Sequence, residues 1–141
     1  CDMIVAAEDA SFSLPEVRRG LIPGAGGAIR AARFLPRAVA LELVAAAAPL
    51  DARRAHALGL VNHLAPAMQV LDEARALAQR IAANAPFAVR QAMRLTRAAA
   101  DFNDDALRAM QEEAVELVRA SPDAAEGARA FVEKREPDWG G

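Results

Sequence analysis

The sequence predicts a helix-rich protein of the α/β or α+β class, and three observations carry that prediction. Residues 3–14 contain a short aliphatic run and an alternating stretch, both typical of strands. After residue 27 the apolar positions recur at helical spacing instead. Only 4% of the 141 residues are aromatic although 54% are hydrophobic, so the core must be built mainly from Ala, Leu and Val, which suits closely packed helices.

The first half of the chain is expected to hold two short strands followed by helices. The strands cover residues 3–7 and 11–14, with a short acidic turn between them. Helical spacing then runs over residues 28–35, which Pro36 ends, and over residues 38–47. Strands that precede helices in this way favour an architecture in which helices pack on a small β segment.

Capping residues mark the elements that follow. Asp51 is expected to cap the next helix, because its side-chain oxygen can accept an N–H group of the first turn, and Gly59 suits a left-handed residue that ends it. The last helix should open with Ser121 as its cap and Pro122 at its first position. Extended chain is expected at residues 60–64, and amphipathic helices at residues 68–81, 87–100 and 107–118.

Charge and composition argue against several classes of partner. The formal net charge is −2, and no basic stripe with interleaved aromatic residues is present, so nucleic acid is not expected to bind. No apolar run approaches the roughly 20 residues that span a bilayer, so no membrane is expected and the default location is cytoplasmic. Cys1 is the only cysteine, and together with His56 and His63 it gives too few ligands for a metal site to be expected.

The chain begins abruptly. Cys1 leads at once into an apolar run without an initiator Met, so we expect the sequence to be part of a longer protein. The helical second half also carries more apolar surface than a short β segment can cover. We therefore expect it to pack on missing chain or on another subunit, as in an oligomer.

Glu16 is the first candidate for chemistry. It lies between Pro15 and Val17, ahead of the glycine-rich turn at residues 24–27. If Leu14, Pro15 and Val17 surround the carboxyl group, they disfavour its charged form and let it act as an acid near neutral pH. The alternative is a solvated surface carboxylate, which is the common state of glutamate.

Other polar residues give weaker signals. Arg18 and Arg19 could receive anionic groups of a ligand, yet paired arginines are more often simple surface charges. His56 and His63 have no carboxylate or nucleophile at a suggestive spacing, so structural roles are expected for both. The glycine turn could stabilise an anion at a helix N-terminus, or its glycines could serve only the tight backbone.

Four blocks of sequence, taken together, resemble one enzyme family. They are, in order, "CDMIVAAEDASFSLPEVRRGLIPGAGGAIRAARFLP", "LDARRAHALGLVNHL", "NAPFAVRQAMR" and "SPDAAEGARAFVEKREPDW". They resemble the C-terminal half of the crotonase family of enoyl-CoA hydratases and isomerases. The resemblance implies an α/β fold in which residues 1–65 end a spiral of ββα turns and carry the loop of the second catalytic glutamate. Residues 66–141 would then form a helical region that makes trimers, often paired as hexamers.

The resemblance also implies roles for residues around the glycine turn. Glu16 matches the family's second catalytic glutamate and would act as acid/base. Gly24 matches the glycine near which hydratases hold the reacting water. Leu14, Val17 and Leu21 would help to form the wall of the acyl pocket.

The block "AFVEKR" resembles a C-terminal helix that, in this family, packs near the adenine end of coenzyme A. Phe131 and Lys134 are its candidate ligand-binding residues, because an aromatic face suits adenine and a cation suits phosphate. The alternative places Phe131 in a helix interface and Lys134 on a solvated face.

Two departures from the family pattern are visible. Residues 46–48 are all Ala where relatives commonly have a turn with glycine, which puts the local helix ending in doubt. After Gly27 the usual Thr and Gln are replaced by Ala28 and Ile29, although Arg30 persists.

The implied activity is that of a lyase that adds water to, or removes it from, a 2-enoyl-CoA thioester through an oxyanion-stabilised enolate. The acyl-CoA is the substrate, and no separate cofactor is expected. A Δ3,Δ2-enoyl-CoA isomerase with one carboxylate and a carnitinyl-CoA dehydratase-like enzyme are the alternatives. If the chain were complete it would lack the upstream glutamate and the oxyanion hole, and a non-catalytic helical assembly module would be the better interpretation.

Overall fold

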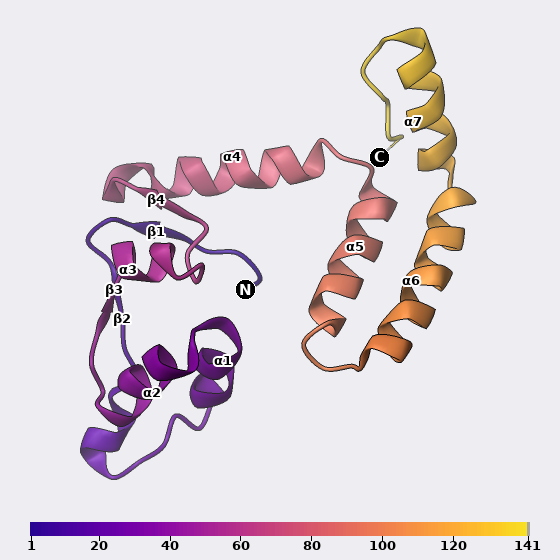
Figure 1. The fold of residues 1–141 in the computed structure, drawn as a ribbon. Coiled ribbons are helices and arrows are strands. Elements are labelled where there is room, and N and C mark those ends of the chain that lie inside the picture. The colour runs from indigo at the N-terminus through magenta and orange to yellow at the C-terminus, as the bar shows by residue number, and fades with distance from the viewer. Residues whose placement is uncertain (141) are drawn as a thin grey trace. The chain divides into compact units, whose positions relative to one another are not determined.

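The computed structural model describes residues 1–140 and divides into two compact units, one over residues 1–77 and one that begins at Ala78. The strands of the described chain all lie in the first unit, and the second unit is built from helices (Figure 1). Strands followed by helices confirm the α/β class expected from the sequence.

The strands of the first unit pair over long distances in sequence. Strand β1 (Val5–Ala7) runs parallel to β4 (His63–Ala65), and β2 (Ser11–Phe12) runs antiparallel to β3 (Leu50–Asp51). The two predicted N-terminal strands are therefore present, but both are shorter than expected, and they pair with later segments. The predicted extended stretch before residue 65 is β4.

Asparagine extends the β1–β4 pairing beyond the strand itself. The Ile4 N–H group donates to Oδ1 of Asn62 over 2.8 Å, and the Asn62 N–H group donates to the Ile4 carbonyl oxygen, also over 2.8 Å. A side-chain amide thus replaces a backbone carbonyl at the end of the ladder.

Helices α1 (Gly27–Phe34), α2 (Arg37–Ala45) and α3 (Ala52–Ala57) complete the first unit. Asp51 caps α3 as predicted, with its Oδ1 accepting the Arg54 N–H group at 2.7 Å. Gly59, two residues beyond the helix, has the expected positive φ of 80°.

Helix α2 ends two residues earlier than predicted. Ala47 adopts the left-handed conformation with φ of 51°, which no continuing helix allows. The Arg18 guanidinium donates through Nη2 to the Ala47 carbonyl oxygen at 2.8 Å and so holds this turn. Arg18 therefore makes a structural contact, and the turn forms although it lacks the family's glycine.

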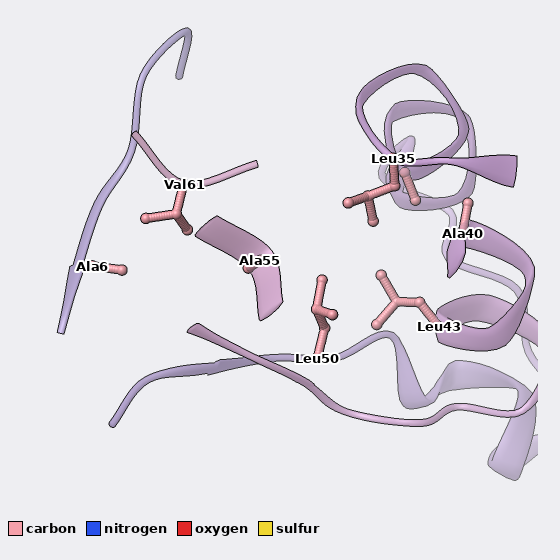
Figure 2. Packing of buried hydrophobic residues seen from close by; sticks show 8 residues of the cluster. Ala6, Leu35, Ala40, Leu43, Leu50, Ala55 and Val61 are labelled. Carbon is pink, nitrogen blue, oxygen red and sulfur yellow. The ribbon is translucent and has the colours of Figure 1, made fainter. Parts of the chain in front are cut away.

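The core of the first unit is made of small and medium aliphatic residues. Ala52 and Ala55 of α3 are fully buried, so this short helix lies close to the strands around it. Leu35, just after α1, points toward Leu43 of α2 and Leu50 of β3 (Figure 2). The buried cluster consists of Ala6, Ala31, Leu35, Ala40, Leu43, Leu50, Ala55 and Val61. The predicted Ala, Leu and Val core is confirmed.

Loss of the α3 cap should destabilise the first unit. Asp51→Ala leaves the Arg54 N–H group without its acceptor, so we expect the free energy of unfolding to fall by about 1 kcal/mol in urea denaturation. Asp51→Asn is the matched control, because asparagine caps helices about as well as aspartate. Equal losses in both variants would show that charge, and not the cap, matters at this position.

Helices α5 (Pro86–Ala98), α6 (Asp104–Arg119) and α7 (Pro122–Glu133) of the second unit form a packed group. The short turn η2 (Ala67–Gln69) and most of α4 (Val70–Ala82) belong to the first unit, and the second unit begins within α4. Helices α5 and α6 lie side by side, and α7 contacts both of them.

Capping and burial in the second unit are uneven. Ser121 caps α7 as predicted, with its Oγ accepting the Ala124 N–H group at 3.2 Å. Val115 and Leu117 of α6 are exposed, so part of its apolar stripe has no cover within this unit. Over the described residues, no helix is both long and apolar enough to cross a membrane.

Candidate active site

Glu16 lies in a tight helical turn, not in an irregular loop. The 3₁₀ turn η1 (Pro15–Arg19) begins at Pro15, whose fixed φ suits a first helical position. Gly20 ends the turn with φ of 71°, and the Leu21 N–H group donates to the Glu16 carbonyl oxygen at 3.1 Å. The backbone around Glu16 is therefore fixed by the proline before it and by the hydrogen bond that its own carbonyl oxygen accepts.

The Glu16 carboxylate has an unusual environment. The residue is half-buried, and its Oε2 atom is fully buried with no hydrogen-bond partner among the described residues. Buried polar atoms are nearly always paired, because an unpaired one costs free energy, so an orphan of this kind needs an explanation. One explanation is that the carboxylate accepts a proton from a ligand, or donates one to it.

The glycine turn packs directly beneath the residue that precedes η1. A Cβ atom on Gly27 would lie 2.9 Å from Leu14 Cδ2 and 3.0 Å from Pro23 Cβ, so only glycine fits there without displacement. Gly26 has φ of 82° at the N-terminal cap of α1. The close approach of Leu14 to Gly27 thus places the residue before η1 against the glycine turn.

Arg30, in the first turns of α1, contacts the glycine turn that precedes the helix. Its Nη1 atom donates to the Ala25 carbonyl oxygen at 2.8 Å, and its guanidinium lies over Gly26. A polar contact after the turn therefore survives, although Ala28 and Ile29 stand where relatives have Thr and Gln. The signal for this contact was present in the sequence as a lone arginine at helical spacing from the turn.

The acyl-pocket candidates around Glu16 differ in exposure. Leu14 and Val17 are half-buried and flank the glutamate, whereas Leu21 is 61% exposed. Gly24 is exposed, and a Cβ atom there would meet only the Ile22 carbonyl oxygen, at 3.9 Å. Leu21 and Gly24 are thus accessible in the described chain, whereas Leu14 and Val17 are partly covered.

Phe131 and Lys134 lie in the second unit, so they are described separately from Glu16. Phe131, in the last turn of α7, is 85% exposed. Lys134 follows the helix in the left-handed conformation, with φ of 54°. Both side chains are therefore accessible within their unit.

Glu126 is the one charged residue that is buried among the described residues, and its role was not predicted from the sequence. Its carboxylate accepts hydrogen bonds from the guanidinium of Arg135 (2.6 and 3.2 Å), the N–H group of Asp138 (2.9 Å) and the guanidinium of Arg129 (2.7 and 3.1 Å). The hydrogen bonds from Arg135 and Asp138, and then that from Arg129, lower the pKa of Glu126 from 4.5 to about 2. The signal available in the sequence was its position four residues before Ala130 on the buried face of α7.

Acid should release the chain that follows α7. Glu126 has a lower pKa in the folded than in the unfolded state, so its stabilisation is complete above about pH 4.5 and is lost as the pH falls toward about 2. Trp139 reports this loss, because its Nε1–H group donates to the Ala83 carbonyl oxygen at 2.9 Å and its ring lies against Gly127. We expect a red shift of Trp139 emission over this pH range.

The control for the acid transition is Glu126→Gln, which has no carboxylate to protonate at this position. Its Trp139 emission should already resemble that of the released state at neutral pH. A wild-type spectrum that stays constant from pH 5 to pH 2 would contradict the assignment of the transition to Glu126.

The remaining polar candidates have structural contacts or none that suggest chemistry. His56 lies with its Nδ1 atom 2.9 Å from the Val61 carbonyl oxygen, close to the end of α3. Within residues 1–140 no group of His, Cys, Asp and Glu side chains is arranged to hold a metal ion. Among the described carboxylates of the first unit, Glu16 stands out because one of its oxygens is buried without a hydrogen-bond partner.

Comparisons with known proteins show the family to which the chain belongs. The family model described as enoyl-CoA hydratase/isomerase matches residues 1–141. The chain is 36% identical over 144 residues to carnitinyl-CoA dehydratase of Citrobacter koseri, covering 99% of this chain and 55% of that protein. The chain therefore spans about half the length of the curated relatives that it matches.

Solved structures show the same coverage. An enoyl-CoA hydratase from Mycobacterium tuberculosis superposes with a TM-score of 0.94 at 45% identity, over 99% of this chain and 55% of that one. One from Mycobacterium marinum gives a TM-score of 0.94 at 46% identity, over 98% of this chain and 55% of that one. The resemblance to the C-terminal half is thus confirmed, and the chain belongs to the enoyl-CoA hydratase/isomerase family.

Proposed function

We propose that the protein of which this chain is part is a hydratase-like lyase acting on 2-enoyl-CoA thioesters, with Glu16 as an acid/base. The observation that carries the proposal is the buried Oε2 atom of Glu16, which has no hydrogen-bond partner among the described residues. The resemblance matches Glu16 to the family's second catalytic glutamate. The names of the similar proteins, enoyl-CoA hydratase and carnitinyl-CoA dehydratase, support the reaction class.

The proposed chemistry requires two proton transfers. Water adds to the β-carbon of the enoyl thioester, giving an enolate, and the α-carbon then receives a proton. Glu16 can perform one transfer, because its buried Oε2 atom has no hydrogen-bond partner among the described residues and is free to exchange a proton with a ligand. A second carboxylate and the N–H donors that stabilise the enolate oxygen would come from the preceding part of the protein.

Several further assignments belong to the proposal. Gly24 would lie beside the reacting water, Leu14, Val17 and Leu21 would line the acyl pocket, and Phe131 and Lys134 would bind the nucleotide end of coenzyme A. Assembly as a trimer or hexamer is supported by the exposed Val115 and Leu117 of α6. We also place the protein in the cytoplasm.

A carnitinyl-CoA dehydratase-like activity is the second candidate, and one observation favours it. Several similar proteins, from Citrobacter koseri and Proteus mirabilis among others, carry that name at 35–36% identity. The chemistry of the site would be unchanged, because dehydration is the reverse of water addition. The two candidates therefore differ in the acyl group and not in the role of Glu16.

The test is to incubate the full-length protein with a 2-enoyl-CoA, and separately with a 3-enoyl-CoA, and to identify the products by NMR. The proposal expects a 3-hydroxyacyl-CoA from the 2-enoyl substrate. Conversion of the 3-enoyl to the 2-enoyl isomer without water addition would show an isomerase instead. No reaction with either thioester would overturn the proposal and favour a non-catalytic module.

A further inference from the structure

The chain reverses direction sharply where α7 ends, and the reversal places a lysine in an unfavourable conformation. The Arg135 N–H group donates to the Ala130 carbonyl oxygen at 3.1 Å, and the Lys134 N–H group donates to that of Phe131 at 3.4 Å. These two bonds form a Schellman motif, whose left-handed position is usually glycine. Lys134 occupies it with φ of 54°, at a steric cost that glycine would not have.

Contacts made by Glu126 compensate for this cost. Its carboxylate lies on α7, before the reversal, and binds the Arg135 guanidinium and the Asp138 N–H group after it. Arg135 also donates to the Glu133 carboxylate at 2.6 Å. Charge-assisted hydrogen bonds of this kind are stronger than neutral ones, so the segment after the helix is fixed to the helix itself.

The two exposed candidates for nucleotide binding are both part of this reversal. Phe131 accepts one of the Schellman hydrogen bonds through its carbonyl oxygen, and Lys134 is the left-handed residue. The direction in which the Lys134 side chain leaves the backbone therefore depends on the turn. A turn that is populated only part of the time would lower the apparent affinity for a ligand by the same fraction.

We propose that Glu126 is a positioning residue, which acts through Arg135 to hold Phe131 and Lys134 in place for the adenosine bisphosphate end of a coenzyme A thioester. This inference rests on the proposed function, because that function supplies the ligand. Glu126 itself does not touch the ligand: it is buried, and its acceptor oxygens are occupied by Arg129, Arg135 and Asp138.

The test compares two thioesters in the full-length protein. Glu126→Gln should raise KM for an enoyl-CoA about tenfold and leave kcat within about twofold. The matching enoyl-pantetheine thioester lacks the adenosine bisphosphate, so its KM should not respond to the substitution. A general loss of folding would affect both substrates, which separates a positioning role from a merely structural one.

Two arginine variants supply matched comparisons. Arg135→Gln removes the link to the turn and should reproduce the KM change of Glu126→Gln. Arg129→Gln removes another guanidinium from the same carboxylate but leaves the turn tied, so its KM should stay near the wild-type value. If Glu126→Gln does not fold, the contrast between the two arginine variants carries the test.

A binding measurement separates this inference from the proposed function. Adenosine 3′,5′-bisphosphate is titrated calorimetrically into the wild type and the three variants. Wild-type binding that weakens about tenfold in Glu126→Gln and Arg135→Gln supports the inference, even if no enoyl thioester is turned over and the proposed function fails. Absence of wild-type binding, equal binding in all variants, or an equal loss in Arg129→Gln would overturn it.

Discussion

Glu16→Gln in the full-length protein is expected to lower kcat for hydration of a 2-enoyl-CoA by about 10²–10⁴-fold, the usual contribution of a positioned acid or base. Glutamine has nearly the same shape as glutamate, but it cannot accept and return a proton at this site. KM should change little, because binding does not depend on proton transfer. Steady-state kinetics with the enoyl absorbance as readout measure both parameters.

Another carboxylate of the same unit provides the control for this prediction. Glu8 pairs with Arg53 at 2.8 Å on the surface, and Glu8→Gln should leave kcat and KM near the wild-type values. Turnover by Glu16→Gln at the wild-type rate would exclude Glu16 as the acid/base. Equal losses in both variants would point to a loss of folded protein instead.

Gly27→Ala should destabilise the first unit by about 1–2 kcal/mol, because the added Cβ atom must displace its neighbours. It would lie 2.9 Å from Leu14 Cδ2 and 3.0 Å from Pro23 Cβ, and the proline ring cannot move aside. The gain in helix propensity, about 0.5–1 kcal/mol, offsets only part of this strain. Leu14 is the more mobile neighbour, so its displacement should also lower turnover at Glu16. Urea denaturation and the hydration assay test the two effects.

Gly24→Ala is the matched substitution in the same turn. Its Cβ atom would meet only one carbonyl oxygen, at 3.9 Å, so stability should stay within about 0.5 kcal/mol of the wild type. A loss of turnover in this stable variant would support the proposed water site beside Gly24. Wild-type stability of Gly27→Ala would show instead that the Leu14 side chain yields without cost.

The helices and their caps were predictable because their signals are local. Asp51 and Ser121 each cap the helix that the sequence assigned to them, and Gly59 has its left-handed geometry. The strand partners were not predictable in this way. Strands of two or three residues contain too little pattern to define a register, so the pairing of β1 with β4 depends on tertiary packing.

The candidate site likewise contains features that were predictable from local sequence and features that depend on the folded structure. The position of Glu16 was predictable from the residues around it, whereas its buried, unpartnered Oε2 atom is a property of the folded turn. Glu126 gave no sequence signal comparable with that of Glu16. Its importance arises from Arg135 and Asp138, which approach it only after the chain reverses at Lys134.

The pairing of β1 with β4 also constrains the order in which the first unit can fold. Ile4 and Asn62 are 58 positions apart, so their contact closes a long loop. The conformational entropy of that loop must be lost before the pairing can stabilise the unit. Helices α1, α2 and α3 lie within that loop and consist of local contacts, which form faster. We therefore expect β1 to pair with β4 after these helices have formed.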